Sequence, residues 1–321
     1  MTVAYHASGA RATYDARVVA NLSRPSAHAL LQGIVLLWGC TAILGHQIAI
    51  QAVPLVWYRL LIVIAVLAVF VPARGLSLRV PAKAALRYAG VGAIVGIHWL
   101  CFYGAIKVAG ITTAVLTLST MAFFTAFIEP IAFRRRIDPR ELAIGALVVA
   151  GVALLLQVEL HPTPFGLALG LGSALFASLF GVMNGRLAHH EPPERLMLYE
   201  AAAAFVVVSL CFTVAPSQLV MPSHADLGWL VVLGVMCTVV PQVLVLHVLR
   251  TLSPFTVAVT TNLEPVYTLI LAAFLFPHDE PLGVRFYLGA AVLLGLVIVN
   301  GVRKAAPIST LPAPSTAIPP G

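Results

Sequence analysis

One carboxylate lies in the middle of an apolar stretch that is long enough to cross a membrane. The stretch runs from Pro254 to Pro277, and Glu264 stands about ten residues from its start. At a rise of about 1.5 Å per residue, this position is roughly 15 Å into a hydrocarbon layer about 30 Å thick. An acid at that depth costs at least about 3 kcal/mol to insert, so Glu264 is a candidate for a functional residue.

The neighbours of this acid predict a break in its helix. Pro265 follows it directly, and Asn262 lies two residues before it. A proline inside a helix frees the carbonyl four residues earlier and often bends the helix. Burial favours a neutral carboxyl group, so protonation of Glu264 in one state and ionisation in another would suit proton-coupled antiport or recognition of a cationic amine. The alternative is a hydrogen-bonded acid that caps the break.

Further polar and aromatic side chains fall near the same depth in other apolar stretches or one helical turn away. Aromatic walls with a few polar groups are what a small-molecule pocket in a helix bundle needs. The alternatives are plain packing of the aromatic side chains and, for the histidine, a hydrogen bond to a neighbouring helix carbonyl. The predicted substrate-binding set is Trp38, His98, Trp99, Tyr103, Thr120, Gln242, Asn262, Glu264 and Tyr267.

Three other charged residues, Arg59, Glu200 and Glu129, lie inside apolar stretches but away from the midplane. Arg59 and Glu200 are at similar depths from opposite membrane surfaces, too far apart to pair, and Arg186 or Arg195 is the predicted partner of Glu200. Glu129 lies near the basic run that follows it. We expect gating or structural charges, with contact to the substrate as the alternative for Arg59 and Glu200.

Composition places the chain among membrane proteins. Apolar residues make up 60% and charged residues 10% of the 321 residues, against about half and about a quarter in soluble domains. The excess of 19 basic over 12 acidic residues is explained by membrane topology, and we expect no nucleic-acid partner. The four cysteines lie in apolar segments without CxxC spacing or a nearby histidine at ligand spacing, so neither disulfides nor a metal site is expected.

Ten apolar spans follow an N-terminal arm (1–27) and precede a proline-rich tail (304–321). Their predicted bounds are His28–Ile48, Val53–Ala73, Ala84–Val108, Ile111–Phe133, Glu141–Val158, Phe165–Ala188, Leu196–Ala215, Leu227–Leu249, Pro254–Phe276 and Gly283–Val302.

The basic residues predict the orientation of these spans. With the N-terminus inside, sixteen lysines and arginines fall on the cytoplasmic side, and only Lys107 and Arg285 fall outside. This division follows the positive-inside rule and places both termini in the cytoplasm.

The chain also repeats itself. GALVVAGVALL begins at Gly145 and GAAVLLGLVIV begins at Gly289, 144 residues later. Two repeats (28–158 and 165–303) with five spans each must enter the membrane in opposite senses, because five is odd. Inverted repeats of this kind are typical of secondary transporters, with a site near the midplane between the halves.

The chain resembles ten-helix transporters of the drug/metabolite transporter superfamily, of the EamA type. The likeness rests on LLWGCTAILG, PLVWYR, HWLCFYGAIKVAGITTAVL, LEPVYTLILAAFLF and GAAVLLG, and it extends over about residues 28 to 303. Such halves often carry a proline near the middle of the fourth helix, where this chain has Met121 and places its Glu-Pro pair later, at Glu129 and Pro130.

The resemblance implies an all-α carrier in the plasma (inner) membrane that moves a small metabolite by alternating access, often as an exporter and without a cofactor. Amino acids or related compounds are the expected substrates, protons are candidate partners beside the lipid bilayer, and a homodimer is left open. A channel is the main alternative, although no charged ring or carbonyl filter is apparent. An enzyme would need a catalytic set, which is missing, and a scaffold protein would not need an inverted repeat.

Overall fold

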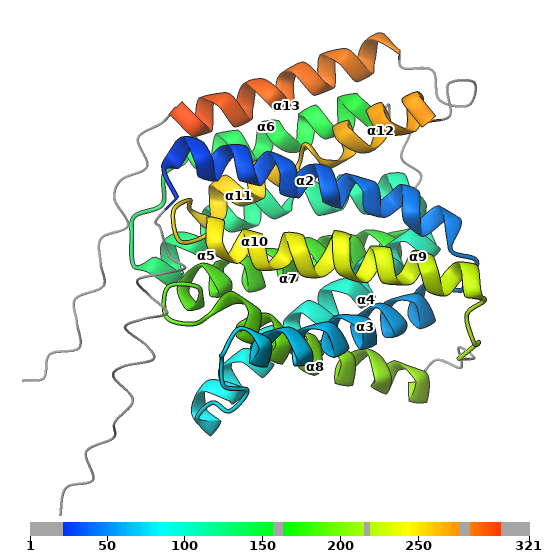
Figure 1. Ribbon diagram of the computed structural model, residues 1–321. Coiled ribbons are helices and arrows are strands. Elements are labelled where there is room, and N and C mark those ends of the chain that lie inside the picture. The colour runs from blue at the N-terminus through cyan, green and yellow to red at the C-terminus, as the bar shows by residue number, and fades with distance from the viewer. Residues whose placement is uncertain (1–21, 157–162, 215–218, 276–282, 303–321) are drawn as a thin grey trace, which may run out of the picture.

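The protein is a bundle of membrane-length helices (Figure 1). The computed structural model describes residues 22–156, 163–214, 219–275 and 283–302, and every regular element in these ranges is helical. Most of the predicted N-terminal arm and the whole predicted tail (304–321) lie outside the described residues, as do the last residues of the fifth, seventh and ninth predicted spans.

The described chain forms twelve α-helices and one π-helix, several of which are two parts of one span. In order they are α2 (Arg24–Gln47), α3 (Ala52–Ala73), α4 (Ala82–Ser119), α5 (Met121–Phe133), α6 (Pro139–Leu156), α7 (Pro164–Leu187), α8 (Pro193–Val214), α9 (His224–Gly234), η1 (Val235–Val239), α10 (Val240–Val248), α11 (Pro254–Thr261), α12 (Glu264–Leu275) and α13 (Val284–Val302). Nine stretches of this part of the chain are long and apolar enough to cross a membrane, and α2, with 24 residues, is the tenth helix of that length. They correspond to the ten predicted spans.

Gly110 separates the third span from the fourth inside the long helix α4. Its φ of 82° and ψ of 162° are not helical, and a positive φ suits glycine because it has no Cβ. The chain therefore turns back here with almost no loop, between Ala82–Gly110 and Thr113–Phe133.

The fourth and ninth spans are both broken near their middles. The fourth is interrupted at Thr120, between α4 and α5, although it lacks the proline of the ninth. The Thr117 and Thr120 hydroxyls donate to carbonyls three or four residues earlier, at 2.6–3.0 Å, and such bonds compete with the helical pattern and often bend helices. In the ninth span α11 ends at Thr261 and α12 begins at Glu264, as the sequence predicts.

The eighth span contains a π-helical turn, η1, between α9 and α10. Pro241 follows it, and its missing N–H disturbs the regular pattern of hydrogen bonds. The Thr238 hydroxyl donates to the Leu233 carbonyl, five residues earlier, at 2.8 Å. Single π-helical turns of this kind are frequent at functional sites.

The contacts between helices follow a two-fold pattern that relates the repeats. The two fifth spans, α6 and α13, pack together at one edge of the bundle, and the two second spans, α3 and α8, pack together at the other (Figure 1). The first span α2 packs against the eighth, and its counterpart α7 packs against the third. Inverted five-helix repeats related by a pseudo-two-fold axis produce this arrangement.

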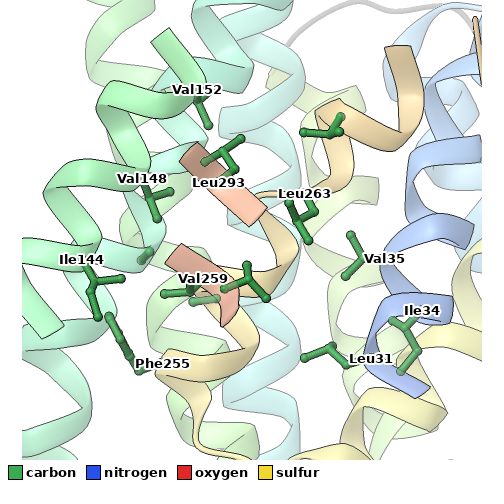
Figure 2. Packing of buried hydrophobic residues seen from close by; sticks show 14 of the residues in the cluster. Leu31, Ile34, Val35, Ile144, Val148, Val152, Phe255, Val259, Leu263 and Leu293 are labelled. Carbon is green, nitrogen blue, oxygen red and sulfur yellow. The ribbon is translucent and has the colours of Figure 1, made fainter. Parts of the chain in front are cut away.

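Two large apolar clusters hold the bundle together on either side of its centre. One is formed by α2, α6, α11, α12 and α13 with neighbouring side chains, and includes Val35, Val148, Phe255 and Leu293 (Figure 2). The other joins α3 to α8 and α10. Many large apolar side chains on the outside of the bundle are exposed, as expected for a surface that faces lipid.

Candidate functional site

A cavity of about 230 Å³ lies between the two clusters and is bounded by helices of both repeats. The predicted substrate-binding residues lie on the first, third, fourth, eighth and ninth spans, and the cavity also takes Arg59 from the second span and Phe180 and Asn184 from the sixth. The wall consists of Trp38, Thr41, Arg59, His98, Trp99, Phe102, Tyr103, Leu118, Met121, Thr125, Ala177, Phe180, Gly181, Val182, Asn184, Cys237, Thr238, Gln242, Val245, Leu249, Pro254, Val257, Ala258, Thr261 and Glu264. Six of the nine predicted substrate-binding residues are among them.

Arg59 brings a positive charge from α3 into this cavity. Its Nε donates to the Thr238 hydroxyl at 2.6 Å, and its guanidinium carbon lies 4.9 Å from the centre of the Trp99 ring. The Thr238 hydroxyl lies on the π-helical turn η1 and itself donates a hydrogen bond to the Leu233 carbonyl. Since only Nε is hydrogen-bonded among the described residues, the two terminal nitrogens remain as donors for a ligand.

Glu264 brings a negative charge to the same cavity from the first position of α12. Across the resolved ranges of the structure, its carboxylate has neither a hydrogen bond nor an ion pair. It is close enough to Arg59 for the two charges to interact, but the two side chains do not form a salt bridge. The cavity is thus lined by two residues of opposite charge, and among the described residues neither the Glu264 carboxylate nor the terminal nitrogens of Arg59 have a hydrogen-bond partner.

His98 lines the cavity and is held in one tautomer by α7. Its Nδ1 lies 2.9 Å from the Ser173 carbonyl and 3.0 Å from the Ser173 hydroxyl. Because a carbonyl only accepts, Nδ1 carries the proton and donates, so that Nε2 of the neutral ring is an acceptor. His98 therefore combines the predicted position in the pocket with the alternative role, a hydrogen bond to a neighbouring helix.

Aromatic rings from three spans form much of the remaining wall. Phe180 on α7 packs against His98, with ring centroids 5.4 Å apart, and Phe102 stacks on His98 at 6.3 Å. Tyr103 and Trp38 also line the cavity. Gln242, next to Pro241, adds an amide to this mostly apolar wall.

The structure does not bring Thr120, Asn262 and Tyr267 to the cavity wall. The Thr120 hydroxyl donates to the Thr117 carbonyl, and the Asn262 amide donates to the Ala258 carbonyl at 2.9 Å. Each side chain therefore bonds to a backbone carbonyl of its own span, next to the helix break at which it lies. The Tyr267 hydroxyl points to α2, where it contacts the Gln32 amide at 2.5 Å.

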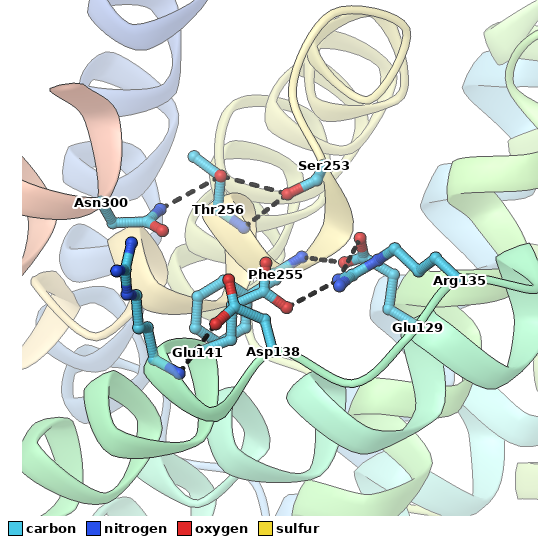
Figure 3. Close-up of polar contacts among 9 residues, drawn as sticks. Glu129, Arg135, Asp138, Glu141, Ser253, Phe255, Thr256 and Asn300 are labelled. Atoms are coloured by element: carbon cyan, nitrogen blue, oxygen red, sulfur yellow. Dashed lines mark hydrogen bonds and ion pairs between the residues drawn. The ribbon is translucent and has the colours of Figure 1, made fainter. Parts of the chain in front are cut away.

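Glu129 forms a buried link between the two repeats (Figure 3). One carboxylate oxygen accepts from the Phe255 N–H at the start of α11, at 2.6 Å, and the other pairs with Arg135 at 3.0 Å. Arg135 also pairs with Glu141 at 2.7 Å. Hydrogen bonds and neighbouring charge from Glu141 and Glu129 raise the pKa of Arg135, although its partial burial acts in the opposite direction.

The predicted partner of Glu200 is wrong. Its carboxylate contacts the Asn184 amide at 3.3 Å, whereas Arg195 pairs with Glu191 at 2.6 Å and Arg186 is exposed. Glu200 and Asn184 are 3% and 1% exposed, so the helices bury this pair, whereas Arg186 lies in the last turn of α7 and Arg195 in the first turn of α8.

Sequence reasoning missed Phe102, Phe180, Thr41, Thr238 and Asn184 as cavity residues. The spacing of Phe102, four residues after His98 on one helix face, was a usable signal. Thr238 was hidden because the π-helical turn alters which side chains of the eighth span face inwards. Among the described residues, no group of three or more histidine, cysteine, aspartate and glutamate side chains gathers that could hold a metal ion.

One model of a known protein family matches both repeats of this chain. The model of the EamA-like transporter family matches residues 26–157 and 164–301. A solved structure, "Crystal structure of protein", has a TM-score of 0.74 and 20% sequence identity, and the similarity covers 87% of this chain and 97% of that one. At this identity it supports the fold alone. Comparison with curated proteins gave no match.

Proposed function

Since this chain belongs to the EamA-like transporter family, we propose that it is a secondary carrier for an amino acid or a related small zwitterion. The chain is a multi-pass membrane transporter of the drug/metabolite superfamily. The observation that carries the proposal is the pair of opposite charges, Arg59 and Glu264, in one cavity between the repeats.

The two charges fit the two ends of an amino acid. The free nitrogens of Arg59 suit a carboxylate, because a planar guanidinium donates two parallel hydrogen bonds. Glu264 suits an ammonium group, and His98 Nε2 offers it a further acceptor. The aromatic rings of Trp38, Phe102 and Phe180 would then contact an apolar side chain.

The size of the cavity favours a single small metabolite. About 230 Å³ is below the range of about 300–1,000 Å³ that drug-sized ligands occupy. An amino acid is of this order, whereas a larger drug would require the wall to move.

The cytoplasmic and outer ends of the cavity are closed to different degrees, and this difference supports alternating access. With both termini in the cytoplasm, as the basic residues indicate, the cavity wall reaches cytoplasmic helix ends at Leu249 and Pro254. Towards the outside, an apolar cluster that includes Ile48, Leu55, Leu230 and Leu233 packs beyond the cavity. There the Ala49 N–H also donates to Asp226, at 2.9 Å, and joins the first span to the eighth.

This arrangement represents a carrier loaded from the cytoplasm, so we propose export across the plasma membrane. Opening the outer side requires the apolar cluster and the Ala49–Asp226 hydrogen bond to separate. In this scheme Glu264 binds the substrate ammonium group, or a proton when no substrate is present.

The proposal is tested by a thermal-shift screen of the purified protein against amino acids, amines, carboxylic acids, purines and sugars. A ligand at a hundredfold excess over its Kd stabilises the folded state by about 2.7 kcal/mol. Amino acids are expected to stabilise the wild type, and Glu264→Gln and Arg59→Gln should each abolish the effect. Glu141→Gln, outside the cavity, is the matched control. Stabilisation that survives both cavity substitutions would contradict the proposed site.

Measurements of substrate flux distinguish a channel from a carrier. A carrier shows flux that saturates with substrate and accelerates when substrate is present on the opposite side, whereas flux through an open pore does neither. Amino-acid uptake into proteoliposomes is therefore measured with and without internal amino acid. The carrier proposal predicts stimulation by internal substrate, and an unchanged, unsaturated rate would refute it.

A further inference from the structure

A second buried polar pair adjoins the cavity and is not needed to bind a zwitterion. Glu200 on α8 and Asn184 on α7 are 3% and 1% exposed. The Asn184 amide nitrogen lies 3.3 Å from Glu200 Oε2. Asn184 also lines the cavity, whereas Glu200 lies behind it. The pair is therefore hidden from lipid and connected to the cavity by one side chain.

Two oxygen atoms of this pair are buried without a hydrogen-bond partner. They are Oε1 of Glu200 and Oδ1 of Asn184, and neither contacts a donor in the part of the chain that the structure describes. Both atoms can only accept while the carboxyl group is ionised. A single proton on Oε1 would provide the missing donor, because a carboxylic acid and an amide can pair through one O–H and one N–H bond.

The packing around Glu200 leaves an ionised carboxylate without compensation. Gly92 on α4 is so close that a Cβ there would lie 2.2 Å from the Glu200 carbonyl oxygen. The two backbones are therefore in contact at this residue, Glu200 is 3% exposed, and an isolated buried charge costs several kcal/mol. The neutral acid is therefore the form that this arrangement accommodates.

No neighbouring charge compensates Glu200 either. Titratable side chains occur on α8, on the helices around it and in the adjoining loops, but within the described ranges none makes a hydrogen bond or ion pair with Glu200. These side chains are Tyr58 and Arg59 on α3, Arg74 and Arg79 between α3 and α4, Lys83, Arg87, Tyr88, His98, Cys101, Tyr103 and Lys107 on α4, Arg186 on α7, His189, His190 and Glu191 before α8, Glu194, Arg195, Tyr199 and Cys211 on α8, and His247 and Arg250 at the end of α10.

We propose that Glu200 and Asn184 form a proton-binding site, distinct from Glu264, whose occupancy is linked to the substrate cavity through Asn184. The proton resides on Glu200 Oε1 and is donated to Asn184 Oδ1, while the Asn184 amide donates to Oε2. Release of the proton leaves an uncompensated carboxylate, which this buried position does not tolerate. Proton release to water therefore requires the helices around Glu200 to open, and this couples the site to transport.

The site itself is tested without any substrate, with the proton as the only ligand. Infrared difference spectra of the protein in lipid nanodiscs report the C=O stretch of a protonated carboxylic acid. The variants are compared in the Glu264→Gln background, because Glu264 can also be protonated when no substrate is present. We expect the band at neutral pH in Glu264→Gln alone and with Glu129→Gln added, its loss when Glu200→Gln is added, and a frequency shift when Asn184→Leu removes the amide partner. A band that persists unchanged when Glu200→Gln is added would overturn the proposal.

Glu200→Gln is expected to fold, because a glutamine amide can donate to Asn184 Oδ1 in place of the proton. Its thermal stability should equal that of wild type at neutral pH and exceed it at alkaline pH, where wild type loses its proton. Equal loss of stability with rising pH in both proteins would contradict the assignment.

The link to transport rests on the proposed function and is tested separately. In proteoliposomes given a mixture of the standard amino acids, Glu200→Gln should retain exchange of internal for external amino acid but lose accumulation driven by a pH gradient. Accumulation at the wild-type level in Glu200→Gln would refute the link. If wild type transports none of these compounds, the proposed function fails, while the infrared measurement still decides the proton site.

Discussion

Replacing Glu129 by alanine should destabilise the protein through the contact between its two repeats. The substitution removes the acceptor of the Phe255 N–H at 2.6 Å and one of the two partners of Arg135 (Figure 3). Arg135 keeps its bond to Glu141, so the guanidinium is not left unpaired. The Phe255 N–H is left buried at the start of α11 without its acceptor.

The magnitude follows from these contacts. A hydrogen bond to a charged group contributes about 1.5–3 kcal/mol, and removal of one member of a buried ion pair costs about 3–5 kcal/mol. Because Arg135 retains a partner, we expect about 3 kcal/mol for Glu129→Ala. At about 2 °C for each kcal/mol in a large domain, the unfolding temperature should fall by about 6 °C. Glu129→Gln keeps an acceptor for Phe255 and should lose about half as much.

Thermal unfolding of the purified protein is the assay, with Glu141→Gln as the control. The Arg135–Glu141 pair is more accessible, with side chains 31% and 16% exposed, and exposed pairs contribute about 0.2–1 kcal/mol. An unfolding temperature for Glu129→Ala no lower than that of Glu141→Gln would refute this reasoning.

Three further predictions concern packing, pH and the site. Gly92→Ala should lower the free energy of unfolding by about 1–3 kcal/mol, because the new methyl group meets the backbone of α8. Gly90→Ala, with open space around the new methyl group, should not. Equal unfolding temperatures of the two variants would contradict the close approach of α4 and α8. His189 lies on the surface before α8, and partial desolvation and then the charges of His190 and Arg250 lower its pKa from 6.5. Its contribution to stability is present above pH 6.5 and is lost as the pH falls through the lowered pKa, and solvent screening keeps it small. His189→Gln should slightly flatten the dependence of unfolding temperature on pH in this range, and an unchanged profile would exclude the effect. Thr238→Val should weaken amino-acid binding, since it removes the hydroxyl that orients Arg59, and unchanged affinity by calorimetry would show that this bond is dispensable.

The apolar spans, the repeat and the break before Glu264 could be predicted from the sequence, because each depends on local composition or on a proline. The break at Thr120 was not predicted, because it depends on hydroxyl-to-carbonyl bonds rather than on a proline. Six of the predicted site residues line the cavity, since inward-facing positions near the midplane follow from helix periodicity.

The sequence left two alternatives for Arg59, a structural charge or contact with the substrate, and could not decide between them because its orientation depends on Thr238, which is 179 residues away on a π-helical turn. Likewise the partner of Glu200 is set by how α7 packs near α8, which places Asn184 rather than an arginine beside it. The short sequence distance and the positive charge of Arg186 and Arg195 had favoured an arginine as the partner of Glu200. The rotation of each helix about its axis decides which of several neighbouring polar side chains makes the contact. Composition and spacing do not give that rotation.

The central claim is that one zwitterion binds between Arg59 and Glu264, and counterflow in proteoliposomes tests it most directly. Vesicles loaded with unlabelled amino acids are given labelled amino acids, and uptake is compared among wild type, Arg59→Gln, Glu264→Gln and Glu141→Gln. The predicted result is saturable uptake in wild type and Glu141→Gln and none in the two cavity variants. Uptake that persists in both cavity variants would contradict the claim.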